Sequence, residues 1–115
     1  MQRRFRLTRN NDINRVRQEG RSLANAILVL GFQPNYLEHN RIAVIAGRSV
    51  GGAVQRNFAK RRLRSAFQKL QAELEQGYDL VFIARKPILD VKFSSLIESL
   101  RLLARQAKIL KDEVT

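Results

Sequence analysis

Apolar residues along the chain alternate between helical spacing and short runs that are apolar almost throughout. A short helix is predicted over residues 11–19, where Ile13 and Val16 lie three positions apart and an asparagine at the start is placed to cap the first turn. Gly20 follows and suits a left-handed helix end. Only a narrow stripe of this helix can be buried, because its remaining positions are polar.

Three runs rich in β-branched and apolar residues predict strands over residues 26–32, 41–46 and 79–84. The first two runs are separated by a turn that begins at Pro34, so they are predicted to form an antiparallel hairpin. The third run is apolar almost throughout, which is typical of a strand covered on both faces.

A long helix is predicted between the second and third strands, over residues 53–76, and Gly77 is expected to end it. Because a crossover this short joins the two flanking strands, they are expected to be parallel. The apolar stripe of this helix recurs every three or four positions and consists of Ala59, Leu63, Phe67, Leu70 and Leu74.

A last helix is predicted to begin near Ser94 or Ser95, because Ser95 and Glu98 have the spacing of a capping box. Its buried face is predicted to consist of Leu96, Leu100, Leu103, Ala107 and Leu110.

The predicted order is helix, two or three strands, helix, strand and helix, which indicates a two-layer sandwich of helices on one small sheet. A chain of 115 residues fits one domain, so residues 1–115 are taken as a single domain. Residues 1–7 show no periodicity and are predicted to form a flexible basic arm.

The charge balance narrows the choice of partner. Lys and Arg number 22 against 10 Asp and Glu, which gives a net charge of +12, and residues 1–64 alone carry +11 of it. Arginines outnumber lysines by 16 to 6, and the guanidinium group clamps phosphate oxygens with two hydrogen bonds and stacks on bases. A polyanion, and nucleic acid in particular, is therefore the expected partner.

Other classes are excluded by the same composition. The chain has no cysteine for a disulfide scaffold, and its apolar runs are far shorter than the ~20 residues that span a bilayer. We expect a cytoplasmic protein without a membrane partner. With 44% hydrophobic residues, the chain is also too apolar to be disordered.

The positive charge is densest in the predicted helix that begins after Gly51-Gly52. On a helical wheel, one contiguous polar flank beside the apolar stripe is formed by Asn57, Lys60, Arg61 and Arg64. Arg56 falls over the apolar stripe, so it is expected either to face a cleft at the open helix end or to be buried with a partner. Like charges four positions apart destabilise a helix unless a partner neutralises them, which disfavours a merely solvated face.

No catalytic or metal-binding cluster is visible in the sequence. The only histidine, His39, lies in a predicted turn, where a solvated side chain is the simplest interpretation. With one histidine and no cysteine a zinc site is out of reach, so no metal is expected on the protein. Asp79 and Asp90 lie at the edges of predicted elements, where turn or capping roles account for them.

The basic helix carries a specific pattern, Gly-x-Ala-x-x-Arg-Asn-x-x-(Lys/Arg)-Arg-x-hydrophobic-(Lys/Arg), matched by Gly51, Ala53, Arg56, Asn57, Lys60, Arg61, Leu63 and Arg64. On these residues the chain resembles the protein component of bacterial ribonuclease P. The resemblance implies an α+β fold: a two-layer αβββαβα sandwich with a small mixed sheet and a left-handed βαβ crossover, as in a ribosomal protein. It also implies that the right-handed rule for crossovers is broken.

The resemblance further implies a subunit of an endoribonuclease that removes the 5′ leader from precursor tRNA. The catalytic site is then in the partner RNA, with Mg²⁺ held by that RNA, and the protein carries no catalytic residue and no cofactor of its own. One protein is expected to pair with one catalytic RNA. The candidate contacts to this RNA are Arg48, Arg56, Asn57, Lys60, Arg61 and Arg64.

A cleft between the first helix and the sheet is implied for the single-stranded leader of precursor tRNA, with Arg6, Arg9, Ile13 and Arg17 as its candidate residues. Positions that are usually aromatic in this cleft hold Ile13, Arg17 and Gly31 here. Leader binding is therefore expected to rest on arginine stacking, or on one of the aromatic side chains Phe5, Phe32 and Tyr36, of which Phe32 is equally well placed for the core.

Three other hypotheses remain to be compared with this one. A general RNA-binding or ribosomal-type protein would share the fold and the basic helix. A protein nuclease would need an acid–base cluster, which the sequence lacks. A binder of anionic membranes would pair a basic flank with a wide exposed apolar face, and neither long helix does.

Overall fold

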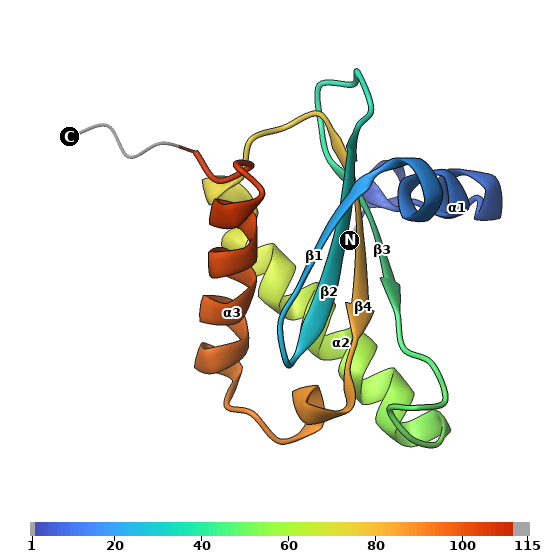
Figure 1. The fold of residues 1–115 in the computed structure, drawn as a ribbon, viewed down its shortest axis with the longest axis vertical. Coiled ribbons are helices and arrows are strands. Elements are labelled where there is room, and N and C mark those ends of the chain that lie inside the picture. The colour runs from blue at the N-terminus through green and yellow to red at the C-terminus, as the bar shows by residue number, and fades with distance from the viewer. Residues whose placement is uncertain (1, 112–115) are drawn as a thin grey trace.

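The computed structural model describes residues 2–111, and it places a four-stranded sheet between helices on its two faces (Figure 1). The predicted order αβββαβα is confirmed. The main elements are α1 (Asn10–Glu19), β1 (Arg21–Ala24), β2 (Leu28–Pro34), β3 (Arg41–Ile45), α2 (Ala53–Leu70), β4 (Tyr78–Ala84) and α3 (Phe93–Gln106). Short 3-10 turns occupy Arg3–Phe5, Gln71–Glu73 and Lys86–Leu89.

The strands lie in the order β1-β2-β4-β3, so the sheet is mixed. β4 is antiparallel to β2 and parallel to β3, which confirms the predicted parallel crossover through α2. The predicted hairpin between the first two long runs is wrong, because β4 lies between β2 and β3. The central position suits β4, since its apolar side chains on both faces need a neighbouring strand at each edge and cover above and below.

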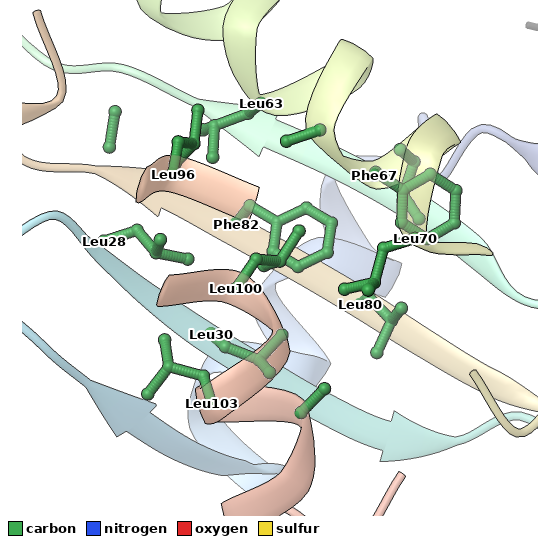
Figure 2. Close-up of a cluster of buried hydrophobic side chains, with 14 of the residues drawn as sticks. Leu28, Leu30, Leu63, Phe67, Leu70, Leu80, Phe82, Leu96, Leu100 and Leu103 are labelled. Atoms are coloured by element: carbon green, nitrogen blue, oxygen red, sulfur yellow. The ribbon is translucent and has the colours of Figure 1, made fainter. Parts of the chain in front are cut away.

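One face of the sheet and two helices form the main core. Leu30 and Phe82 point from β2 and β4 toward α2 and α3, which cover this face together (Figure 2). The predicted apolar stripe of α2 is buried from Ala59 to Leu70, and Leu74 is buried in the turn that follows. Leu96, Leu100 and Leu103 are the corresponding buried side chains of α3. These two helices and the sheet form the two layers that the sequence predicted, and α1 lies on the opposite face of the sheet.

The opposite face of the sheet is only partly covered. α1 crosses it and buries Val16 against Ala43 and Val81. The next row of the same face runs across β2, β4 and β3 through the partners Val29, Ile83 and Ile45, and these three side chains are only half-buried. Beside α1, an apolar strip of sheet therefore remains accessible.

Several helix ends differ from the predictions. Gly20 is not left-handed: its φ is −76°, and it is glycine because a Cβ would lie 2.5 Å from the carbonyl oxygen of Val16 and 2.7 Å from that of Phe32. α2 ends at Leu70, and Leu74 then pairs with Leu110 in a separate bridge, so the chain has already left the helix before Gly77. α3 begins at Phe93, one position before the serines that were expected to cap it.

The segment before α1 is docked on the fold. The backbone N–H of Leu7 donates to the carbonyl of Ile42 over 2.7 Å, and the Leu7 side chain is 3% exposed. The His39 Nε2 atom lies 3.2 Å from the carbonyl oxygen of Arg4, and its ring meets the ring of Phe5 edge-on at 5.2 Å. The end of the predicted arm is thus anchored on the sheet at Leu7, and His39 is a packing residue. The remaining residue of that arm, at position 1, lies outside the described residues.

A buried carboxylate holds α1 against the sheet. Asp79 of β4 is 1% exposed and accepts hydrogen bonds from Arg41 Nε at 2.8 Å, Arg41 Nη2 at 2.7 Å and Asn35 Nδ2 at 3.0 Å. Arg15 of α1 reaches the same carboxylate at 3.6 Å. The two hydrogen bonds from Arg41 to Asp79 raise the pKa of the Arg41 guanidinium. Asp79 does lie near the start of β4, as predicted, but it is the centre of a buried ion-pair cluster and not the turn or capping residue that the sequence indicated.

Replacing Asp79 by asparagine tests this role. The substitution leaves Arg41 and Arg15 without their shared anion, so we expect Asp79→Asn to lower the free energy of unfolding by about 3 kcal/mol. Asp12→Asn is the matched control, because among the described residues Asp12 forms an ion pair only with Arg15, three positions on in α1, at 3.1 Å, and such pairs contribute less than about 0.5 kcal/mol. Equal losses in urea unfolding of the two variants would contradict the assignment.

Gly20→Ala tests the close approach between α1 and β2. The new Cβ meets two backbone oxygens that cannot rotate away, so we expect the free energy of unfolding to fall by about 1–3 kcal/mol. Gly47→Ala is the control, since a Cβ at Gly47 meets nothing within 4 Å and should change stability by less than about 0.5 kcal/mol. Thermal or urea unfolding of both variants measures the difference.

Candidate nucleic-acid interface

The exposed flank of α2 carries the predicted basic surface. Helix formation places the cations away from the buried stripe, because the stripe recurs every three or four positions and the cations fill the positions between. Asn57, Arg61 and Arg64 are exposed and Lys60 is half-buried, while Arg48 is exposed in the loop before the helix. We call these five residues, together with Arg56, the basic face of α2.

No carboxylate of residues 2–111 pairs with this face. Among residues 2–111 the five ion pairs involve only Arg15, Arg41 and Arg101 as cations, and none of these belongs to α2. If carboxylates of the same chain paired with these guanidinium groups, no open cationic surface would remain. The guanidinium groups left unpaired among the described residues therefore form the kind of surface that an external polyanion binds.

Arg56 differs from its neighbours on the basic face. It is half-buried near the start of α2, and its Nε atom is buried without a hydrogen-bond partner among the described residues. Of the two places expected for this residue, the structure favours the open helix end over burial with a partner. Val54, two positions before Arg56, is 79% exposed, which shows how open this end of the helix is.

A groove of about 240 Å³ runs along the edge strand β3 and joins the two groups of predicted site residues. Arg6 and Ile13 line it from the side of α1, and Arg64 lines it from α2. Its remaining lining is Leu7, Thr8, Ile42, Ala43, Val44 and Ile45. The structure thus connects the basic face of α2 with the accessible strip of the sheet.

The other two residues predicted for the leader cleft are exposed and do not line this groove. Arg9 directly precedes α1, and Arg17 lies on α1 one helical turn after Ile13, on the same side of the helix. Arg17 is therefore placed beside the accessible strip of the sheet. The opposite flank of α1 is the one that Arg15 ties to Asp79.

None of the aromatic candidates for leader stacking lines this groove. Phe32 is 5% exposed and belongs to the main core, which is the alternative that the sequence left open. Phe5 packs against His39 and Arg4. Tyr36 is 94% exposed, with a φ of 61°, in the β2–β3 connection. The planar groups near the groove are guanidinium groups, which leaves arginine stacking as the remaining expectation.

Sequence reasoning missed two features of this region. Arg64 was assigned to the basic helix alone, but it also lines the groove shared with α1. The clamp at Asp79 was missed as well, although a lone carboxylate at the start of an otherwise apolar strand was a usable signal. Both features arise from contacts between segments far apart in the chain.

The described residues contain no cluster of three or more His, Asp or Glu side chains that could hold a metal ion. None of their helices combines the length and apolar character that crossing a membrane requires.

Comparisons with known proteins agree with this geometry. The family model described as Ribonuclease P matches residues 1–108. The "Ribonuclease P protein component" of Chloroflexus aurantiacus is 42% identical over 111 residues, which cover 96% of this chain and 82% of that protein. The protein of the same name from Caldanaerobacter subterraneus is 33% identical over 108 residues, with coverages of 94% and 93%.

Solved structures give the same result. The RNase P protein of Staphylococcus aureus superposes with a TM-score of 0.82 at 29% identity, covering 93% of this chain and 98% of that one. The RNase P protein of Thermotoga maritima superposes with a TM-score of 0.78 at 32% identity, with coverages of 87% and 96%. A match of family model, sequence and fold over nearly the whole chain shows that this chain belongs to the ribonuclease P protein family, whose members are the protein subunits of an endoribonuclease.

Proposed function

We propose that this chain binds the catalytic RNA of ribonuclease P through the basic face of α2 and holds the 5′ leader of precursor tRNA beside α1. One protein pairs with one catalytic RNA, and that RNA carries the catalytic site. The observation that carries this proposal is the cationic face of α2, which pairs with no carboxylate in the part of the chain that the structure describes, in a member of this family.

The basic face suits a folded RNA because such an RNA presents closely spaced phosphates. Each guanidinium or ammonium group that meets a phosphate releases a condensed counterion, which favours binding at low salt. Arg56, Lys60 and Arg64 follow one another at intervals of four residues, and the repulsion between them is relieved when phosphates lie between them. Neutralising the RNA in this way lowers the Mg²⁺ concentration that the RNA needs.

The groove along β3 and the apolar strip beside α1 suit a single strand. Ile45 and Ile83 supply an apolar floor for unpaired bases, and Arg6 and Arg17 lie beside it for the phosphates or for stacking. Arg9, exposed just before α1, adds charge at the same side. A strand held here binds by shape and charge, so this site favours precursor tRNA over the mature product with little dependence on leader sequence.

The metal ions of the reaction belong to the RNA in this proposal. Hydrolysis of a phosphodiester with metal ions needs carboxylate or phosphate oxygens as their ligands. The described residues offer no such cluster of carboxylates, whereas the RNA is a chain of phosphates. The protein contributes by binding and orienting the two RNAs.

Reconstitution with the ribonuclease P RNA of the same cells tests the proposed function. At a low Mg²⁺ concentration, we expect cleavage of precursor tRNA to rise when the protein is added to the RNA, and the protein alone to cleave nothing. Binding to the protein–RNA complex should be tighter for precursor than for mature tRNA. A protein that binds both tRNAs equally and leaves cleavage unchanged would be a general RNA-binding protein, and the proposal would be wrong.

Arg61→Ala tests the basic face. Because the substitution removes one phosphate contact, we expect the slope of log K against log salt concentration, for binding to the catalytic RNA, to become shallower by about one unit. The preference for precursor tRNA should not change. Arg105→Ala is the control, since Arg105 is an exposed cation of α3 outside the basic face. Identical slopes for both variants and the parent chain would remove Arg61 from the interface.

A further inference from the structure

The flank of α2 that faces away from the β3 groove carries a second groove, of about 300 Å³. Its lining is Phe58, Arg61, Arg62 and Ser65 of α2 with Phe93 at the start of α3. This volume lies at the lower end of the range of about 300–1,000 Å³ found for small-molecule sites. None of the sites described above accounts for this groove, although Arg61 also belongs to the basic face of α2.

Two exposed aromatic rings on two different helices are the first distinguishing feature. The Phe58 side chain is 39% exposed and that of Phe93 is 36% exposed, whereas Phe67 and Phe82 in the core are 4% and 1% exposed. Packing does not require rings at these two positions, because both lie at the rim of the fold. Rings that share one groove provide a surface on which a planar ligand group can stack.

Arg62 is the second feature. Its guanidinium carbon lies 5.3 Å from the centroid of the Phe58 ring, and its Nη2 atom donates to the carbonyl oxygen of Val91. Its Nε atom is buried without an acceptor among the described residues, and Arg62 takes part in none of the ion pairs there. The guanidinium group of Arg62 is therefore held against the Phe58 ring, and the lining of the groove contains no acidic residue.

We propose that this groove binds an unpaired nucleotide of the same RNA that docks on the basic face of α2. The base stacks against Phe58 and Phe93, and Arg61 and Arg62 attract the adjoining phosphates. This inference rests on the proposed function, because it extends the RNA interface around α2 from Arg61, which belongs to both surfaces. Aromatic rings combined with arginines are the general means of binding unpaired bases.

A second copy of this chain is a poorer occupant for the same groove. A twofold dimer through this surface would bring two copies of Arg61 and two of Arg62 together with no carboxylate in the lining. Repulsion between those four cations opposes such a dimer, whereas an RNA strand brings both the planar groups and the negative charge.

Leucine substitutions at both rings test the stacking. Phe58→Leu and Phe93→Leu keep an apolar side chain at the rim, so the fold should persist, which urea unfolding of each variant checks. We expect the double variant to bind the ribonuclease P RNA of the same cells about 5- to 150-fold more weakly, the range for one stacked base. The single variant Phe93→Tyr should keep the affinity of the parent chain, since a tyrosine ring stacks as well.

Salt dependence separates this site from the basic face. A stacked base releases no counterion, so the double variant should keep the salt slope of the parent chain, whereas Arg61→Ala makes it shallower. Leu102→Ala is the control, because Leu102 is a 50% exposed apolar residue of α3 outside the groove, and its affinity for the RNA should equal that of the parent chain.

Cross-linking identifies the occupant. The chain has no cysteine, so Phe93→Cys gives a unique attachment point for a photoactivated cross-linker. Cross-links to one unpaired position of the catalytic RNA support the proposal. Cross-links to a second protein chain, or an unchanged affinity of the double leucine variant, would overturn it. If the parent chain itself fails to bind the RNA, the proposed function is wrong. If Arg61→Ala weakens binding but the double leucine variant does not, the basic face still binds the RNA and only the proposal for the aromatic groove is wrong.

Discussion

Positive charge on α2 that no carboxylate of residues 2–111 neutralises is the constraint on which the rest of this structure depends. Repulsion between like charges one helical turn apart costs only a few tenths of a kcal/mol per pair, whereas each large apolar side chain buried from the opposite stripe stabilises the fold by about 1.5–3 kcal/mol. Leu63, Phe67 and Leu70 therefore hold α2 in place against the repulsion. The charge is thus available for a partner at little expense to the fold.

The two faces of the sheet have different roles, one in stability and the other in the proposed binding of the leader. α2 and α3 close the first face with a continuous apolar core, which gives the molecule its stability. α1 covers the second face only in part and is fixed there by the clamp at Asp79 on one of its flanks. The other flank leaves Ile45 and Ile83 accessible, so the same arrangement that anchors α1 also creates the strip proposed for the leader.

α2 links all the proposed RNA contacts. Arg64 joins the basic face to the groove along β3, and Arg61 joins it to the aromatic groove at Phe58 and Phe93. One helix packed on a face of the sheet beside the edge strand β3 can in this way contact a folded RNA along its length and reach a single strand at its side. A rigid helix suits this role because its side chains keep fixed spacings relative to one another.

The amino-acid sequence by itself determined the helices, the three longer strands, the parallel crossover and the basic flank of α2, because each depends on a local periodicity of apolar and charged residues, whereas the short strand β1 leaves no such pattern. Only the tertiary structure decided which strands are neighbours: the predicted hairpin was wrong because pairing depends on where β4 must be buried, and not on proximity in the chain. The docking of Leu7 on Ile42, the ion pairs of Asp79 and the meeting of Phe58 with Phe93 in one groove likewise join residues that the sequence keeps far apart. Contacts of that kind leave no periodic pattern, since they depend on how whole elements pack.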